Sequence, residues 1–164
     1  MTADCLGTDG SPVFLFSMDK RQIRAEMKER RRRVSAQERE RYSRLVCELL
    51  APYKDRRVCC YEALPDEIDL APFTQVCRDV CFPRKRGREY VVEKPEEVEV
   101  WVCPGLAFTL DGKRLGFGGG WYDRFLASAD PQALKLGVAY PWQIVDDLPQ
   151  APTDVKLDRI VYVR

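Results

Sequence analysis

The sequence predicts an α/β fold: a single three-layer, Rossmann-like domain with a mainly parallel sheet and helices on both faces. Along residues 57–164, short apolar runs bounded by charged residues alternate with helical patterns, which is typical of such a sheet. The 164 residues suffice for one ordinary domain. Apolar residues at 45% and charged residues at 32% indicate a folded, soluble protein, not a disordered or membrane one.

The first residues and the cysteines narrow the class of protein further. Residues 1–17 show little periodicity, so we expect a disordered tail before a domain over residues 18–164. No apolar run approaches the roughly 20 residues of a membrane helix, and none near the start resembles a signal peptide. The seven cysteines include no C-x-x-C pair and no histidine accompanies them, which favours reduced, buried thiols over zinc ligands or disulfides. These features predict a cytoplasmic protein.

Two helices are expected at the start of the domain. Asp19 is well placed as the N-cap of the first, in which Ile23 and Met27, with Arg31 one turn further on, share a face. A capping box, Ser-x-x-Glu at residues 35–38, begins a second helix that runs to about residue 53. Its expected apolar stripe consists of Leu45, Leu49 and Leu50. Residues 19–57 hold fourteen Lys and Arg against seven Asp and Glu, so this segment should attract anions.

Short elements follow from residue 57 onward. Apolar runs between charged or turn residues predict strands at residues 58–61, 79–83, 98–103, 135–140 and 159–163. Helices are expected at residues 69–77 and 122–127, and a basic, glycine-containing loop at residues 84–88.

Residues 114–124, Arg-Leu-Gly-Phe-Gly-Gly-Gly-Trp-Tyr-Asp-Arg, are the most informative segment. Four glycines within residues 116–120 remove side chains where the backbone must approach something closely. The helix expected next would point its free N–H groups at the loop, a ready site for phosphate. The segment is neither a Walker A loop nor G-x-G-x-x-G, and a tight turn is the alternative for the glycines alone. Flanking Arg114, Tyr122 and Asp123 supply a phosphate donor, a stacking ring and a metal-seeking carboxylate.

Further motifs accompany this loop. Residues 104–108 read Pro-Gly-Leu-Ala-Phe, residues 20–24 read Lys-Arg-Gln-Ile-Arg, and residues 66–69 read Asp-Glu-Ile-Asp. Together with the C-terminal stretches 143–149 and 154–158, they resemble the 5-formyltetrahydrofolate cyclo-ligase family in order and spacing. The resemblance covers residues 18–164. It implies that ATP phosphorylates the formyl oxygen of 5-formyltetrahydrofolate, that N10 then attacks, and that phosphate leaves to give 5,10-methenyltetrahydrofolate.

The resemblance also implies site residues. Arg114 and Tyr122 would be catalytic. The residues that would contact ATP are Lys20, Arg21, Gln22, Ile23, Arg24, Arg114, Leu115, Gly116, Phe117, Gly118, Gly119, Gly120, Trp121 and Tyr122. The reduced folate would contact Glu62, Glu67, Gly118 and Tyr122, and Mg²⁺ would be held by Asp123 and Asp154. ATP and a reduced folate would be the partners of a monomer that binds neither nucleic acid nor membrane.

Two departures from the family pattern leave alternatives open. Thr153 stands where many relatives have histidine, and the chain is short between residues 83 and 104, where relatives carry part of the folate pocket. The chain is therefore either an enzyme or a truncated homologue that binds nucleotide or folate without catalysis. An RNA-binding module on the basic residues 28–33 is a third reading, although acidic residues interrupt that cluster and no aromatic residue accompanies it. Lys20 and Arg24 could also form a solvated helix face, while Glu67 and Asp154 could serve as caps.

Overall fold

The two predicted N-terminal helices are present in the structure, a computed structural model that describes residues 18–164. Helix α1 spans Lys20–Arg32, and its N-cap Asp19 forms a capping box with Gln22. Helix α2 spans Ala36–Leu50 and begins with the predicted capping box of Ser35; a 3-10 turn, η1 (Ala51–Tyr53), continues it. The caps satisfy N–H groups that a helix start leaves unpaired, which is why the sequence located both starts correctly. The expected tail, residues 1–17, lies outside the described residues.

A five-stranded sheet forms the centre of the fold, with strand order β2-β1-β5-β8-β9. All four neighbouring pairs are parallel, which confirms the predicted sheet. The strands are β1 (Arg57–Cys59), β2 (Asp79–Cys81), β5 (Val100–Cys103), β8 (Leu134–Val138) and β9 (Arg159–Val161).

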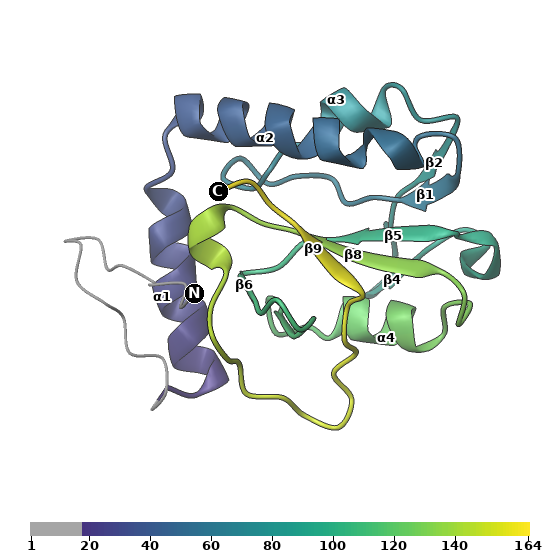
Figure 1. Ribbon diagram of the computed structural model, residues 1–164. Helices are drawn as coiled ribbons and strands as arrows, with labels where there is room; N and C mark the ends of the chain where they lie inside the picture. Colours follow the sequence, from purple (N-terminus) through teal and green to yellow (C-terminus); the bar gives the residue numbers. More distant parts are fainter. Residues whose placement is uncertain (1–17) are drawn as a thin grey trace.

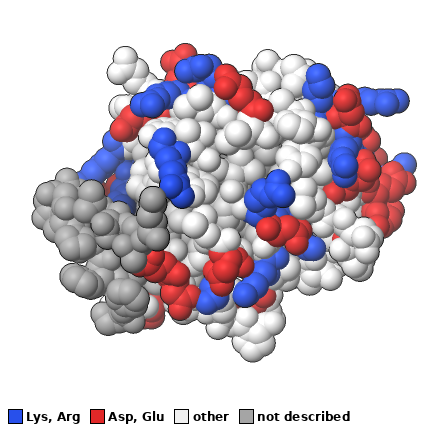
Figure 2. Space-filling view, in the orientation of Figure 1, with Lys and Arg blue, Asp and Glu red and all other residues white. Residues whose placement is uncertain are grey.

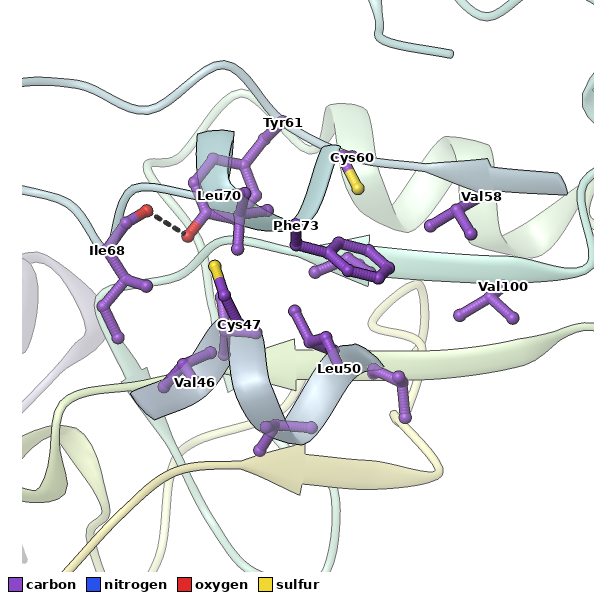
Figure 3. Packing of buried hydrophobic residues seen from close by; sticks show 14 of the residues in the cluster. Val46, Cys47, Leu50, Val58, Cys60, Tyr61, Ile68, Leu70, Phe73 and Val100 are labelled. Carbon is purple, nitrogen blue, oxygen red and sulfur yellow. Dashed lines mark hydrogen bonds between the residues drawn. The ribbon is translucent and has the colours of Figure 1, made fainter. Parts of the chain in front are cut away.

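Helices cover both faces of this sheet, as predicted (Figure 1). Helix α2 and the short α3 (Ala71–Thr74) lie on one face, and α4 (Trp121–Ala127) lies on the other. On the first face Leu50 and Phe73 pack against Val58 and Val100 of the strands (Figure 3). Phe73 is 1% exposed, so its truncation to alanine would cost about 3–5 kcal/mol of stability.

Helix α1 belongs to neither layer and instead stands beside the end of the sheet where β5 leads into β6 (Ala107–Phe108) (Figure 1). Its apolar face, Ile23 and Met27, packs on Leu106 and Leu115 in a separate cluster. Leu115 belongs to β7 (Arg114–Leu115), which pairs with β6 in a small antiparallel hairpin. That hairpin was not predicted, because each of its strands has only two residues. The carboxyl ends of parallel strands are where ligands bind in open α/β sheets, so α1 borders that region.

Three local predictions were wrong. The helix expected at residues 69–77 is only α3, Ala71–Thr74, since the chain soon turns into β2. The basic segment after residue 83 is not a loop but a hairpin of β3 (Arg84–Arg86) and β4 (Glu89–Val91), turning at Gly87 with φ 63°. Of the stripe expected in α2, Leu50 is buried but Leu49 is exposed; the buried residues are Ser43, Val46, Cys47 and Leu50, because the face of the helix toward the sheet carries Val46 and Cys47 and not Leu45 and Leu49. Two further 3-10 turns are η2 (Pro95–Glu97) and η3 (Pro141–Gln143).

The six cysteines of the described part of the chain are all free thiols. Four of them are buried, as expected for cysteines that pack as small apolar residues. Burial raises the pKa of the Cys103 thiol to about 12, so it stays protonated. Among residues 18–164 there is no helix long and apolar enough to cross a bilayer.

Candidate functional site

A cavity of about 710 Å³ opens among α1, the loop after β1, the β3–β4 hairpin and the segment that leads into α4. Residues far apart in the sequence meet in its wall. The predicted site residues that line it are Lys20, Arg24, Glu62, Glu67, Arg114, Leu115, Gly116, Phe117, Gly118, Gly119, Gly120, Trp121, Tyr122, Asp123 and Asp154. The fold therefore brings nearly the whole predicted set into one place.

The glycine loop, residues 116–120, joins β7 to α4 along this cavity. Gly118 has φ 108° and Gly120 has φ 70°, conformations that other residues rarely adopt. The Nε of Arg24 donates a hydrogen bond of 2.9 Å to the carbonyl of Gly116. A Cβ added at Gly116 would lie 2.9 Å from Nη1 of Arg114. The glycines thus permit both the turn and the close approach of two arginines.

Arg114 is the most enclosed cation of the cavity wall, with a side chain that is 4% exposed. Its Nη1 donates to the carbonyl of Pro104 at 2.9 Å, and its Cζ lies 5.4 Å from the ring centroid of Tyr122. Nη2 is 3.7 Å from Oδ2 of Asp123, while the buried Nε has no hydrogen-bond partner. Arg114 is therefore held rigidly, with hydrogen-bonding capacity left over for an anion.

A hydrogen bond from the backbone beside Asp154 links the Asp123 side chain to the segment that carries Asp154. Oδ1 of Asp123 accepts a 3.0 Å hydrogen bond from the N–H of Val155, the residue after Asp154. Oδ2 of Asp154 contacts Nζ of Lys20 at 2.5 Å. Burial opposes ionisation of Asp154, but the N–H of Ala151 and the Lys20 ammonium outweigh it and hold the pKa of this carboxyl below its usual range. Both carboxyl groups line the cavity.

Two carboxylates suit magnesium, because Mg²⁺ commonly binds one or two of them and takes its remaining ligands from water and phosphate. The part of the chain that the structure describes holds no group of three or more Asp, Glu, Cys or His side chains able to bind a metal ion. Asp123 and Asp154 therefore fit a Mg²⁺ ion that takes further ligands from a phosphate. They do not fit a metal site made of protein ligands alone.

Glu67 lines the same cavity from the loop after β1. It is 7% exposed, and burial raises the pKa of its carboxyl to about 7, although the Arg31 guanidinium partly offsets the effect. The hydroxyl of Tyr61 donates to the carbonyl of Ile68 at 2.8 Å, which fixes the loop (Figure 3). Glu62 is exposed by comparison and pairs with Arg84 of the hairpin at 2.8 Å.

Tyr122, one of the two predicted catalytic residues, lies in the first turn of α4 and lines the wall. Burial raises the pKa of its hydroxyl well above the usual value, as does the nearby Cys103 thiol. Its hydroxyl therefore stays protonated and can act only as a hydrogen-bond donor or acceptor near neutral pH.

Three predicted ATP contacts are not part of the cavity wall. Ile23 is fully buried in the core beneath α1, Gln22 is used in the capping box, and Arg21 is exposed. In a helix only residues three or four positions apart share a face, so Lys20 and Arg24 reach the cavity while the residues between them do not.

The structure also places residues at the site that sequence reasoning missed. Tyr90 of the β3–β4 hairpin lines the cavity, and its ring lies edge-on to Trp121 with centroids 5.5 Å apart. The sequence predicts only a basic loop at residues 84–88, and no predicted strand includes Tyr90. Thr153, which stands where the family pattern has histidine, also lines the wall. Arg31 lies behind Glu67; its place on the face of Ile23 and Met27 was the available signal.

Comparison with known proteins decides the family. Residues 80–163, slightly more than half of the chain, match the sequence model described as the 5-formyltetrahydrofolate cyclo-ligase family. The chain belongs to the 5-formyltetrahydrofolate cyclo-ligase family. This confirms the family expected from the motifs around the glycine loop.

Two solved structures share the fold of this cyclo-ligase family member. One is a 5,10-methenyltetrahydrofolate synthetase from Mycoplasma pneumoniae, with a TM-score of 0.76 and 26% identity, covering 88% of this chain and 99% of that one. The other is the Aquifex aeolicus 5,10-methenyltetrahydrofolate synthetase, with a TM-score of 0.74 and 31% identity, covering 88% and 89%.

Several curated relatives align over shorter segments. The mitochondrial 5-formyltetrahydrofolate cyclo-ligase of Arabidopsis thaliana is 39% identical over 84 residues, which are 45% of this chain and 30% of that protein. The match to the Mycoplasma pneumoniae cyclo-ligase spans 41% of that protein. The chain thus spans less than half the length of the first curated cyclo-ligases that it matches.

Proposed function

We propose that this chain is an ATP- and Mg²⁺-dependent 5-formyltetrahydrofolate cyclo-ligase that forms 5,10-methenyltetrahydrofolate and releases ADP and phosphate. One observation carries the proposal: a single cavity is lined by the cations and glycine loop of a phosphate site, by two carboxylates suited to Mg²⁺, and by a buried carboxylate with aromatic rings. The solved synthetase from Mycoplasma pneumoniae is matched over 99% of its chain, so no large part of that protein lacks a counterpart here.

The phosphate end of the site would be formed by α1 and the glycine loop. Lys20 and Arg24 approach from α1, and Arg114 lies beneath the loop. In the structure Lys20 contacts Asp154 and Arg24 contacts the loop carbonyl, so each cation is already oriented into the site by a partner. An ATP triphosphate would exchange these partners for phosphate oxygens, and the small loop residues would let its backbone N–H groups approach.

Asp123 and Asp154 would hold Mg²⁺ beside the triphosphate. When bound, the ion would neutralise charge on the phosphate oxygens. Asp154 is suited to this, since its depressed pKa keeps it ionised over the whole physiological range. The contact between Lys20 and Asp154 supports this assignment, because the cation that would bind phosphate lies beside the carboxylate that would bind the metal.

The folate end would be formed by the loop after β1 and the β3–β4 hairpin. The buried Glu67 carboxylate would accept hydrogen bonds from N–H donors of the pterin ring, and Tyr90 beside Trp121 would contact the flat rings of the folate. The hairpin thus supplies an aromatic side chain within residues 83–104, the segment that is shorter than the family pattern. Tyr122, with its protonated hydroxyl, would lie between the two ends.

The proposed chemistry asks mainly for positioning and charge neutralisation, which a chain without histidine can provide. The formyl oxygen would attack the γ-phosphorus and ADP would leave. N10 would then attack the activated carbon, lose its proton, and expel phosphate. Arg114 would donate to the phosphoryl oxygens as their charge grows, because its rigid guanidinium needs no reorganisation.

The deciding experiment is the absorbance rise of methenyltetrahydrofolate when the protein, Mg-ATP and 5-formyltetrahydrofolate are mixed. Turnover that stops when ATP or Mg²⁺ is omitted supports the proposal. ATP binding without turnover at saturating folate would instead favour a homologue that binds but does not catalyse. An RNA-binding role receives no support from the surface in Figure 2, where Lys and Arg are interspersed with Asp and Glu on the face drawn.

A further inference from the structure

Arg31 carries a buried charge that packing of its helix does not require. It lies in the last turn of α1, and its side chain is only 5% exposed. Its position follows from the helical period, since it shares a face with the core residues Ile23 and Met27. An apolar side chain would fill such a position at lower cost, because a buried guanidinium must recover its lost hydration from nearby groups.

The partners of Arg31 come from two loops of the proposed site. Its Nε lies 3.0 Å from Oδ1 of Asp66, and its Nη1 lies 4.0 Å from Oε1 of Glu67. Its Cζ stands 5.0 Å from the ring centroid of Phe117, which belongs to the glycine loop. Neither Nε nor Nη1 has an aligned hydrogen bond, so these contacts are held by charge and by the aromatic face.

Arg31 does not line the cavity itself. It lies on a small crevice of about 10 Å³ that is also lined by Tyr61, Glu67 and Pro104, all three of which face the main cavity as well. Of the side chains that Arg31 contacts through its guanidinium, Glu67 and Phe117 line the cavity, so its effect on a ligand would pass mainly through these two.

We propose that Arg31 is a positioning residue: it ties the acidic loop that carries Glu67 to the glycine loop that carries Phe117, and so couples the folate end of the site to the phosphate end. This inference rests on the proposed cyclo-ligase function, and nothing in the motifs shared with the family assigns Arg31 a role.

The charged groups around Glu67 make the coupling measurable. Arg31 of α1 favours the ionised carboxylate and Asp66 opposes it, while Arg39 of α2 donates from Nε to the Glu67 carbonyl at 2.8 Å and acts more weakly on the side chain. The other titratable groups that face it are the hydroxyls of Tyr61, Tyr122 and Tyr140. Removing the Arg31 charge should therefore raise the pKa of Glu67 further above about 7.

The test compares Arg31→Met with a matched control, Arg30→Met. Arg30 precedes it on α1, is 7% exposed, and within residues 18–164 forms its ion pair with Glu26 at 3.2 Å; it does not line the cavity. Two quantities are measured from about pH 6 to about pH 9: kcat/KM for 5-formyltetrahydrofolate, and the titration of the Glu67 carboxyl carbon by ¹³C NMR. The NMR titration does not depend on turnover.

We expect Arg31→Met to move the acidic limb of kcat/KM and the Glu67 titration up by about one pH unit, with roughly a tenfold loss of kcat/KM near neutral pH. Arg31→Lys keeps the charge and should retain most of the activity, whereas Arg30→Met should move neither quantity. An unchanged titration in Arg31→Met, or an equal shift in both methionine variants, would overturn the proposal.

A second variant covers the case in which Arg31→Met does not fold. Phe117 is 39% exposed, so Phe117→Leu should leave the fold intact. We expect Phe117→Leu to lower kcat/KM for the folate about threefold without moving the Glu67 titration. In the double variant with Arg31→Lys, the loss of kcat/KM should differ from the product of the two single losses. Strict additivity would refute the coupling. If the wild type shows no turnover, the cyclo-ligase proposal fails by itself, while the NMR titration of Arg31→Met against wild type still decides whether the Arg31 charge controls Glu67.

Discussion

Glu67→Gln should stabilise the protein at neutral pH while weakening folate binding. Glu67 is 7% exposed, and burial raises the pKa of its carboxyl from 4.5 to about 7 because it disfavours the charged form. The nearby Arg31 guanidinium opposes this rise but does not cancel it. The folded protein thus binds this proton more tightly than the unfolded chain does. The associated stability is fully present below pH 4.5 and is lost as pH rises through about 7.

The size of the effect follows from that interval. At about 1.4 kcal/mol for each pH unit, the ionised carboxylate costs at most about 3 kcal/mol of folding free energy above pH 7. Glutamine keeps the shape and removes the charge, so we expect a gain of about 1–3 kcal/mol at about pH 8 and little gain at about pH 5. For a domain of this size the gain corresponds to roughly 3–9 °C in Tm.

Thermal melts of wild type and Glu67→Gln at both pH values test this directly, with Glu62→Gln as the control because Glu62 is exposed. The same Gln variant should bind 5-formyltetrahydrofolate at least about tenfold more weakly, since an amide cannot accept pterin N–H donors as a carboxylate does. A Glu67→Gln variant that is no more stable than wild type at pH 8 would refute the reasoning. It would show that Arg31 and Arg39 fully compensate for burial.

Four further outcomes are expected. Arg114→Ala should lower kcat about a hundredfold, which corresponds to about 3 kcal/mol of transition-state stabilisation. Steady-state kinetics and a parallel measurement of ATP binding will show whether kcat falls more than the affinity for ATP. Asp123→Asn and Asp154→Asn should each weaken Mg²⁺ activation about tenfold or more, measured as the Mg²⁺ concentration at half-maximal rate; an unchanged value in both would remove the metal assignment. Tyr90→Ala should raise KM for the folate severalfold and leave KM for ATP unchanged, and the reverse pattern would place Tyr90 at the wrong end of the site. Gly118→Ala should cost about 1–3 kcal/mol of stability because of its positive φ, and equal stability by denaturant unfolding would show that the loop relaxes.

The sequence determined the features that depend on neighbours along the chain. The capping residues Asp19 and Ser35 located two helix starts, and the glycines at residues 116–120 identified the loop, because caps and positive φ are local requirements. The alternation of strands and helices was likewise enough to predict a parallel sheet. The motifs around the loop then led to the family and to most of the residues in the cavity wall.

Tertiary structure decided what depends on contacts between distant segments. The contact of Lys20 with Asp154 joins opposite ends of the chain, and that of Asp123 with Val155 joins residues 32 positions apart. The helical positions of residues 21–23 excluded them from the cavity, although the linear motif had included them. The β3–β4 hairpin brought Tyr90 to the site from a segment with no obvious strand pattern.

Arg31 and Glu67 show the physical reason for this division. The helical period places Arg31 on the face of Ile23 and Met27, but it does not say what the guanidinium would contact. Only packing buries its guanidinium between Asp66 and Phe117, and only burial moves the pKa of Glu67 toward neutrality. Electrostatic effects of this kind depend on desolvation and on distances of a few ångströms, which the order of residues does not specify.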